Sequence, residues 1–271
     1  MANKHGDFIW YELMTTDADA ASDFYGKVVG WSNDKTSMPG MDYRMLQIDG
    51  RNAAGLMAIT PEMAAGGAKP GWLGYVGVDD VDKMAQSVAD GGGTVHVAPT
   101  EILGVGRFAM VTDPQGAPFY VMRGASDETS TVFSYDTPRA GHCAWNELMT
   151  TDPTAALHFY GQRFGWVKDG EMDMGPMGKY EFLRHAGHAP DGSPPGHGML
   201  GAVMPMMPGG APSPVWTFYF RVPDIDAAVD LINTNGGTIT QEPIEIPGGD
   251  YSMSAIDPQG AHFALVGSRS S

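Results

Sequence analysis

The stretch from Trp10 to Asp17 (WYELMTTD) decides the fold, because the chain repeats it as WNELMTTD from Trp145 to Asp152. The two copies lie 135 residues apart, and the same offset carries Phe24-Tyr25-Gly26 onto Phe159-Tyr160-Gly161. A match of this length at a constant offset is typical of an internal repeat. The chain is therefore a tandem duplication.

The second copy also carries an insertion. Later in the chain the offset is 144 instead of 135, as where Asp113 to Ala117 (DPQGA) recurs at Asp257 to Ala261. The extra residues fit the Gly- and Pro-rich segment from His185 to Gly198, which we predict to be an exposed loop. The repeat predicts a first domain at residues 1–124, a polar linker at 125–141 and a second domain at 142–271.

The composition limits the classes of partner. The formal net charge of −16 at pH 7 disfavours nucleic acid and anionic membrane surfaces. No apolar run approaches the roughly 20 residues of a membrane span, and the first residues show no secretory pattern. The single cysteine, Cys143, suits a reducing compartment, although it does not prove one. We expect a cytoplasmic protein, as a monomer or a homodimer, whose partner is a small molecule.

The repeated stretch predicts a strand followed by a helix. Phe8 to Met14 is rich in aromatic and apolar residues, and the two-residue period of a strand places Trp10, Glu12 and Met14 on one face. Asp17 is a favoured N-cap, and apolar residues then recur at helical spacing until Gly30. Further strands, at residues 31–38, 43–48 and 54–59, complete a βαβββ unit.

The same order of elements follows again after a connector from Pro61 to Pro70. It comprises a strand at residues 72–78, a helix capped by Asp79 or Asp80, and strands near 94–97, 107–112 and 119–122. The DPQG sequence before the last strand is a turn signature. Because the second copy repeats this scheme, we predict an α+β fold of two domains, each built from two βαβββ units.

These motifs resemble the vicinal-oxygen-chelate superfamily, the group of glyoxalases, bleomycin resistance proteins and extradiol dioxygenases. The resemblance rests on the Asp capping motif with Phe-Tyr, the Gly-Trp that follows it and Asp-Pro-Gln-Gly before the last strand, and it covers nearly the whole chain. It implies that paired units curl their sheets into an open, incomplete barrel around a cup, where most of the enzymes hold a divalent metal. The reaction is not implied, because this scaffold hosts many activities.

The resemblance also implies where metal ligands would stand. Carried over residue by residue, these positions are Trp10, Leu73 and Tyr120 in the first half, and Trp145, Thr217 and Ala264 in the second. None of these side chains is a good ligand for a divalent ion. We therefore predict no metal there and no cofactor, with a divalent metal kept as the alternative.

Aromatic residues at these positions suggest a pocket for a flat or apolar molecule. Trp72 and Trp216 begin the fifth strand of each half and add to the aromatic walls, while methionines form the edges. The predicted pocket comprises Trp10, Trp72, Leu73, Tyr120, Trp145, Trp216, Thr217 and Ala264. The alternative is that these rings fill the interior and leave no cavity.

Three residues are candidates for catalysis. Glu12 and Glu147 share the inward face with a tryptophan, and a carboxylate in an apolar cup can act as a general base. Each could instead accept hydrogen bonds that fix its strand. His262 could face Glu147, but Pro118 occupies the matching place in the first half. His185, His188 and His197 lie in the insertion, where a solvated loop is the favoured interpretation over a metal site.

The leading hypothesis is thus a metal-independent small-molecule-binding protein with one cup in each half. The second is a glyoxalase-like lyase or isomerase in which Glu12, Glu147 or His262 moves a proton next to a carbonyl. The third is a resistance protein that sequesters a drug without changing it.

Overall fold

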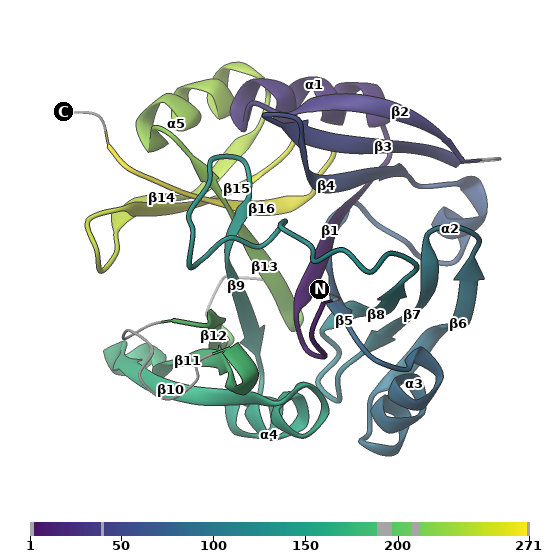
Figure 1. The fold of residues 1–271 in the computed structure, drawn as a ribbon. Helices are drawn as coiled ribbons and strands as arrows, with labels where there is room; N and C mark the ends of the chain where they lie inside the picture. The colour runs from purple at the N-terminus through teal and green to yellow at the C-terminus, as the bar shows by residue number, and fades with distance from the viewer. Residues whose placement is uncertain (1–2, 39–40, 189–196, 208–211, 270–271) are drawn as a thin grey trace. The chain divides into compact units, whose positions relative to one another are not determined.

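The computed structural model describes residues 3–38, 41–188, 197–207 and 212–269, and their strands form two eight-stranded mixed sheets (Figure 1). The first sheet has the order β2 (Ser32–Met38), β3 (Met41–Ile48), β4 (Arg51–Ala58), β1 (Phe8–Thr15), β5 (Gly71–Gly77), β8 (Pro118–Gly124), β7 (Gly106–Thr112) and β6 (Thr94–Ile102). The second repeats it as β10 (Trp166–Asp173), β11 (Lys179–His185), β12 (Met199–Pro205), β9 (Cys143–Thr150), β13 (Val215–Val222), β16 (His262–Gly267), β15 (Tyr251–Ile256) and β14 (Thr238–Glu245). The α+β class and the open sheets are confirmed.

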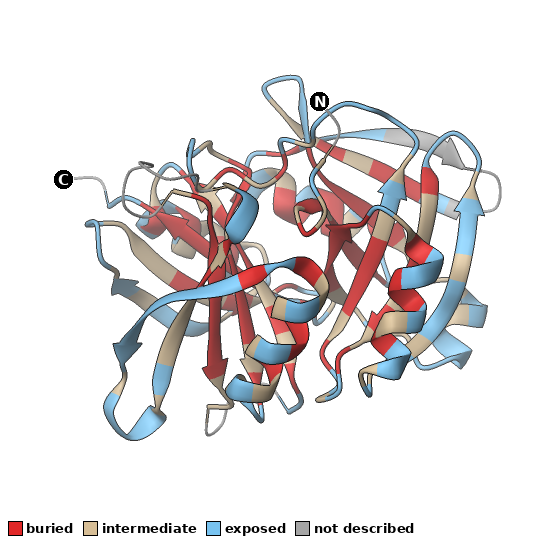
Figure 2. Ribbon diagram, turned by 60° about the horizontal axis from the view of Figure 1, so that its bottom comes forward, coloured by how far each residue is buried: buried red, intermediate tan, exposed pale blue. Residues whose placement is uncertain are grey.

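Four helices begin at aspartates, as the sequence predicts. They are α1 (Ala18–Val28), α3 (Val81–Asp90), α4 (Pro153–Phe164) and α5 (Ile225–Thr234), with N-caps Asp17, Asp80, Asp152 and Asp224. Each cap side chain accepts a hydrogen bond from a backbone N–H in the first turn, which has no partner within the helix. Figure 2 shows the buried inner faces of the helices and the buried central strands.

Two expectations about connecting segments are corrected. Pro61–Ala65 forms a short helix, α2, within the stretch expected to be only a connector. The hydroxyl of Thr60 caps it by accepting from the Met63 N–H at 3.3 Å, and proline is well tolerated in a first turn. His185 was expected in an exposed loop, but it is the buried last residue of β11 and precedes a 3-10 turn, Ala186–His188. Most of the predicted loop, residues 189–196, lies outside the described residues.

The chain divides into two compact units, and each combines one βαβββ unit from each copy of the repeat. The first unit contains Met1–Ile9, Gly74–Ser130 and Trp145–Trp216. The second contains Trp10–Leu73, Thr131–Ala144 and Thr217–Ser271. The predicted boundaries at 124, 125–141 and 142 follow the repeat and stay predictions. No helix among the described residues is both long enough and apolar enough to cross a membrane.

Repeated motifs meet in the core of the first unit. The fully buried hydroxyl of Tyr160 donates to Asp113 Oδ2 at 3.1 Å and accepts from Trp216 Nε1 at 3.0 Å. Asp113 Oδ1 also accepts from the N–H groups of Gln115 and Ala117, which fixes the predicted DPQG turn. Burial raises the pKa of Asp113, and burial followed by the charge of Asp113 raises the pKa of Tyr160 well above its ordinary value.

The second unit repeats this cluster with the roles of the copies exchanged. Tyr25 donates to Asp257 Oδ2 at 3.1 Å and accepts from Trp72 Nε1 at 3.0 Å. A tyrosine of one copy thus bonds the turn aspartate of the other copy in both units. All of these groups are buried, and a buried polar group without a hydrogen bond destabilises the fold. Each hydrogen bond in the two clusters avoids that cost.

Candidate functional site

In the first unit, a glutamate and a tyrosine hydroxyl are hydrogen-bonded to each other beside aromatic rings on strands β9 and β11. The hydroxyl of Tyr180 donates to Glu147 Oε2 at 2.7 Å, and the indole Nε1 of Trp145 donates to the same hydroxyl at 2.7 Å. Glu147 is 9% exposed, whereas Trp145 and Tyr180 are half-buried. Phe182 lies two residues after Tyr180 and contacts the rings of both Trp145 and Tyr180. Trp145, Tyr180 and Glu147 therefore form a chain of hydrogen bonds beside aromatic rings.

The second unit contains the corresponding residues on β1, β3 and β4. Trp10 Nε1 donates to the hydroxyl of Tyr43 at 2.9 Å. Glu12 is 4% exposed and pairs in register with Gly55 of β4. A Cβ at Gly55 would lie 2.1 Å from the Tyr43 hydroxyl and 2.9 Å from Trp10 Nε1, so both groups lie directly over this glycine. The structure thus confirms that Trp10 and Glu12 share a face.

The sequence reasoning missed Tyr43 and Tyr180. The offset of 135 maps Tyr43 onto Gly178, because the second copy has two more residues between the helix and this strand. Aligning the two copies strand by strand, instead of by the constant offset of 135 residues, would have paired the two tyrosines. In the structure, Tyr43 pairs with Met57, whereas its neighbour Arg44 pairs with Leu56.

Trp72 and Trp216 lie in the buried clusters that surround the motif tyrosines. Trp72 is 6% exposed and contacts the ring of Phe220, which also contacts Tyr11. Tyr11 and Glu12 alternate along β1, so Trp72 packs on the face opposite to Glu12. Trp216 is buried against Tyr160 and Trp166.

The other predicted pocket residues are placed as follows. Leu73 is buried next to Trp72 and, by the strand period, faces the other side of β5. Tyr120 is buried and stacks on Tyr75, with 4.3 Å between ring centroids and an interplanar angle of 10°. Ala264 of β16 is fully buried opposite Tyr219, and Thr217 of β13 is half-buried.

His262 is the exposed first residue of β16 and pairs with Ile256. It belongs to the second unit, whereas Glu147 belongs to the first. The proposed pairing of these two side chains therefore stays a prediction.

The residues at the superfamily's metal positions do not fit a divalent ion. Both indole N–H groups, of Trp10 and Trp145, donate to tyrosine hydroxyls, and an indole nitrogen offers no lone pair to a metal. The remaining positions supply a leucine, a phenol, a threonine hydroxyl and a methyl group. Zn²⁺ is held by His, Cys and carboxylate ligands, and Ca²⁺ and Mg²⁺ by several oxygen ligands that include carboxylates; neither set of three side chains supplies these.

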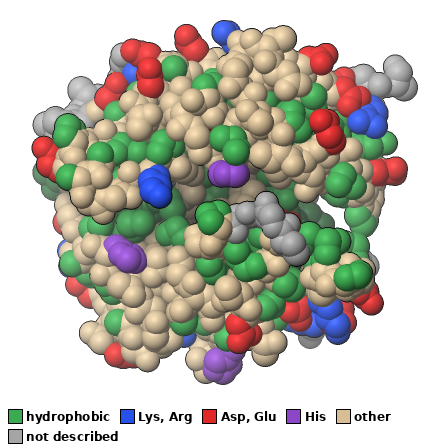
Figure 3. Space-filling model, turned by 180° about the vertical axis from the view of Figure 1, so that it is seen from behind, with side chains coloured by type: hydrophobic (Ala, Val, Ile, Leu, Met, Phe, Trp, Pro, Cys, Tyr) green, Lys and Arg blue, Asp and Glu red, His purple; other side chains and the backbone are tan. Residues whose placement is uncertain are grey.

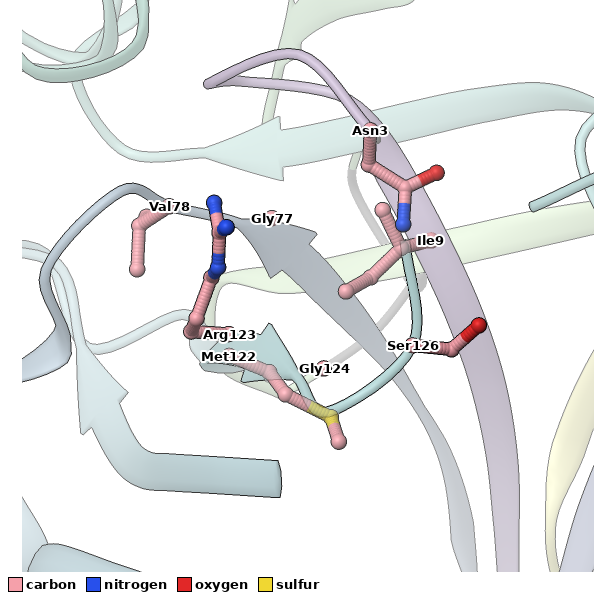
Figure 4. A pocket seen from close by; sticks show the side chains of 8 residues that line it. All are labelled: Asn3, Ile9, Gly77, Val78, Met122, Arg123, Gly124 and Ser126. Atoms are coloured by element: carbon pink, nitrogen blue, oxygen red, sulfur yellow. The ribbon is translucent and has the colours of Figure 1, made fainter. Parts of the chain in front are cut away.

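A hollow of mixed polarity lies in the first unit (Figure 4). It is lined by Asn3, Ile9, Gly77, Val78, Met122, Arg123, Gly124 and Ser126. None of the predicted site residues lines it. On the face drawn in Figure 3, acidic side chains outnumber basic ones, in keeping with the net charge of −16.

The arrangement at Glu147 suits both binding and proton transfer. Aromatic rings offer stacking area, and the Tyr180 hydroxyl with the Glu147 carboxylate offers one polar point that fixes orientation. A carboxylate within hydrogen-bond reach of a hydroxyl is also an arrangement used in general acid–base chemistry.

Comparison with known proteins gives matches over nearly the whole length. The family model described as "Glyoxalase/Bleomycin resistance protein/Dioxygenase superfamily" matches residues 8–121 and 139–265. CFP32 of Mycobacterium bovis, a protein provisionally named a glyoxylase, is 34% identical over 265 residues, which cover 97% of this chain and 95% of CFP32. The anthracycline biosynthesis protein DnrV of Streptomyces peucetius is 32% identical over 268 residues, covering 95% and 91%.

Solved structures share the fold at low sequence identity. The 2,2',3-trihydroxybiphenyl 1,2-dioxygenase of Sphingomonas wittichii has a TM-score of 0.64 at 14% identity, covering 97% of this chain and 91% of the dioxygenase. The Mn(II)-bound glyoxalase of Novosphingobium aromaticivorans has a TM-score of 0.62 at 15% identity, covering 98% and 83%. The chain belongs to the Glyoxalase/Bleomycin resistance protein/Dioxygenase superfamily.

Proposed function

We propose that this protein binds a planar, hydroxylated aromatic molecule without a metal at the superfamily's metal positions. The observation that carries the proposal is the hydrogen-bonded chain from Trp145 through Tyr180 to Glu147. The second unit offers the same three residue types in Trp10, Tyr43 and Glu12, where the Trp10 indole donates to the Tyr43 hydroxyl. The residues at the metal positions support the absence of an ion there, since they offer no suitable ligand set.

The chemistry of these residues favours an aromatic ligand with a hydroxyl or carbonyl group. Indole and phenol rings stack on flat molecules, and the Glu147 carboxylate accepts a hydrogen bond from a ligand hydroxyl. The name of one relative supports this class, since DnrV is an anthracycline biosynthesis protein.

Thermal-shift screening with planar phenols and quinones tests the proposal. A ligand of the native state raises the melting temperature by mass action, and stacking on Trp145 quenches its fluorescence. Tyr180→Phe removes only the hydroxyl and should weaken binding by about tenfold, the equivalent of about 1.4 kcal/mol. Tyr251→Phe is the matched control, because Tyr251 belongs to the second unit, where it packs under the Arg269 guanidinium. Equal affinity of both variants would contradict a role for Tyr180.

A second candidate function is proton transfer next to a carbonyl, in a lyase or isomerase. The contact between Tyr180 and Glu147 favours it, because the carboxylate would take the proton and the tyrosine hydroxyl would hold the carboxylate in place. Glu147→Gln should then abolish turnover of any converted ligand while preserving binding. Unchanged turnover in Glu147→Gln and in the corresponding Glu12→Gln would remove this candidate.

Drug sequestration is the third candidate. A compound that stabilises the protein and is recovered chemically unchanged after prolonged incubation favours sequestration over catalysis. Mass spectrometry of the recovered ligand distinguishes the two outcomes.

A further inference from the structure

The segment Lys4–Asp7, ahead of β1, is held against the end of β11 in the first unit. Trp166 Nε1 donates to the carbonyl of Gly6 at 2.8 Å, and His185 Nε2 donates to the carbonyl of His5 at 2.7 Å. The Lys4 ammonium donates to the carbonyl of Gly187 at 2.8 Å. The side chain of Asp7 is thereby brought to two histidines that lie about 180 residues later in the sequence.

Three potential metal ligands converge at this place. His188 Nε2 lies 2.6 Å from Asp7 Oδ1, and His185 Nε2 lies 4.0 Å from the same oxygen. One ligand atom from each of the three residues lies within 4.8 Å of the others. His185 is buried at the end of a strand, so its position is supported by the sheet and not by a flexible loop.

The fold does not require this polar cluster. At the corresponding place in the second unit, Trp31 Nε1 donates to the carbonyl of Gly141 at 2.8 Å, as Trp166 does to Gly6. A Cβ at Gly141 would lie 2.8 Å from Ile48 Cδ1, whereas a Cβ at Gly6 would lie 2.9 Å from His185 Nε2. Ile48 therefore fills the space that His185 fills, and an apolar side chain is sufficient there for packing.

We propose that Asp7, His185 and His188 bind a divalent transition metal ion, at a site separate from the superfamily's metal positions. Two imidazole nitrogens and one carboxylate oxygen suit Zn²⁺, Co²⁺ or Ni²⁺ better than Mg²⁺ or Ca²⁺, which prefer oxygen ligands alone. The ion fastens the segment Lys4–Asp7 to the end of β11. Because the equivalent place in the second unit holds Ile48, the site occurs once among the described residues.

Binding exchanges hydrogen bonds for coordinate bonds. On each neutral imidazole the hydrogen moves from Nε2 to Nδ1, and the ion replaces the contacts of His188 with Asp7 and of His185 with the His5 carbonyl. The Gly187 N–H, which donates to His185 Nδ1 at 2.9 Å, must turn towards water. Gly187 is exposed and has no side chain, so this turn meets little resistance.

Titration of the chelator-treated, full-length protein with Co²⁺ tests the site. One equivalent should bind and give visible absorption bands, and Zn²⁺ should displace it and raise the melting temperature. Asp7→Asn and His188→Ala should each weaken Co²⁺ binding by at least tenfold. His158→Ala, which removes an exposed histidine on α4 of the same unit, should bind as the wild type does.

His185→Ile separates a lost site from a lost fold. It copies the side chain found at the equivalent place, so it should keep the melting temperature of the metal-free protein and lose Co²⁺ binding. Absence of stoichiometric binding to the wild type overturns the proposal. Equal binding by Asp7→Asn, His188→Ala and the wild type also overturns it, because the ion would then bind at other residues.

Discussion

Tyr160 shows how a motif that marks the family acts in the structure. The sequence repeats this tyrosine, the DPQG aspartate and the tryptophan of the fifth strand, and the structure joins all three by hydrogen bonds in a buried core. Such groups stabilise the fold mainly because each would be unsatisfied without the others. The tyrosine, aspartate and tryptophan motifs thus serve the core of each unit, while the aromatic face at Glu147 joins Trp145 and Glu147 of the repeated strand to Tyr180, which lies outside the motifs.

Tyr160→Phe should reduce the free energy of unfolding by about 1–3 kcal/mol, because it leaves the Asp113 carboxyl and the Trp216 N–H without this partner. The ring remains, so the loss reflects the hydroxyl alone. Urea unfolding followed by circular dichroism measures the change. Tyr251→Phe serves as control and should stay within about 0.5 kcal/mol; an equally small effect of Tyr160→Phe would show that its hydroxyl contributes little.

The titration of Asp113 predicts a dependence of stability on pH. Burial raises the pKa of Asp113 above its ordinary value of 3.8, so the folded chain holds this proton more tightly than the unfolded chain. Its contribution to the free energy of unfolding is therefore largest at low pH and falls as the pH rises from 3.8 through the raised pKa. Relative to Asp113→Asn, which does not titrate, the wild type should lose stability over that interval and then remain level. Urea unfolding of both proteins between about pH 4 and 7 measures this. If the difference between their free energies of unfolding does not change with pH, the prediction is contradicted.

At the scale of elements, the strands show what periodicity predicts and what it does not. The predicted sharing of one face by Trp10 and Glu12 is correct, since both lie on the side of Tyr43, while Tyr11 contacts Phe218. The pairing of β4 with β1 also brings Gly55 opposite Glu12 and leaves room for the Tyr43 hydroxyl. Alternation predicts a face, but the register between strands determines which side chains meet on it.

Gly55→Ala tests this register. The new methyl group would lie 2.1 Å from the Tyr43 hydroxyl, so Tyr43 must move and its hydrogen bond with Trp10 should break. We expect a loss of about 1–3 kcal/mol in the free energy of unfolding, as is usual for overpacking, and a shifted Trp10 indole N–H resonance in NMR spectra. Gly124→Ala, where a new methyl group would have no neighbouring atom within 4 Å, should change neither; an unshifted Trp10 resonance in Gly55→Ala would argue against the described geometry.

At the scale of the whole molecule, the sheets follow the repeat and the compact units do not. Each eight-stranded sheet comes from one copy, whereas each unit combines βαβββ units from both copies. Tyr25 of the first copy bonds Asp257 of the second, and Tyr11 contacts Phe218. The hydrophobic cores are therefore shared between the two copies.

A fragment of residues 1–124 should consequently not fold stably on its own, and it should show no cooperative unfolding transition. It lacks the partners of Tyr25 and Tyr11, so much of its core would be exposed to water. Co-expression with residues 125–271 should restore a single cooperative thermal transition, measured by circular dichroism. A sharp transition of the isolated fragment would show instead that one copy of the repeat folds independently.

The sequence by itself determined the duplication, the α+β class, the capped helices and the family, because these depend on local patterns and on similarity between segments. Only the tertiary structure decided that Tyr43 and Tyr180 accompany Trp10 and Trp145, that the motif tyrosines bond the opposite copy, and that Asp7 meets His185 and His188. These contacts join residues up to 232 positions apart. Periodicity describes each element separately, whereas such contacts arise from the packing of elements that are distant in the chain.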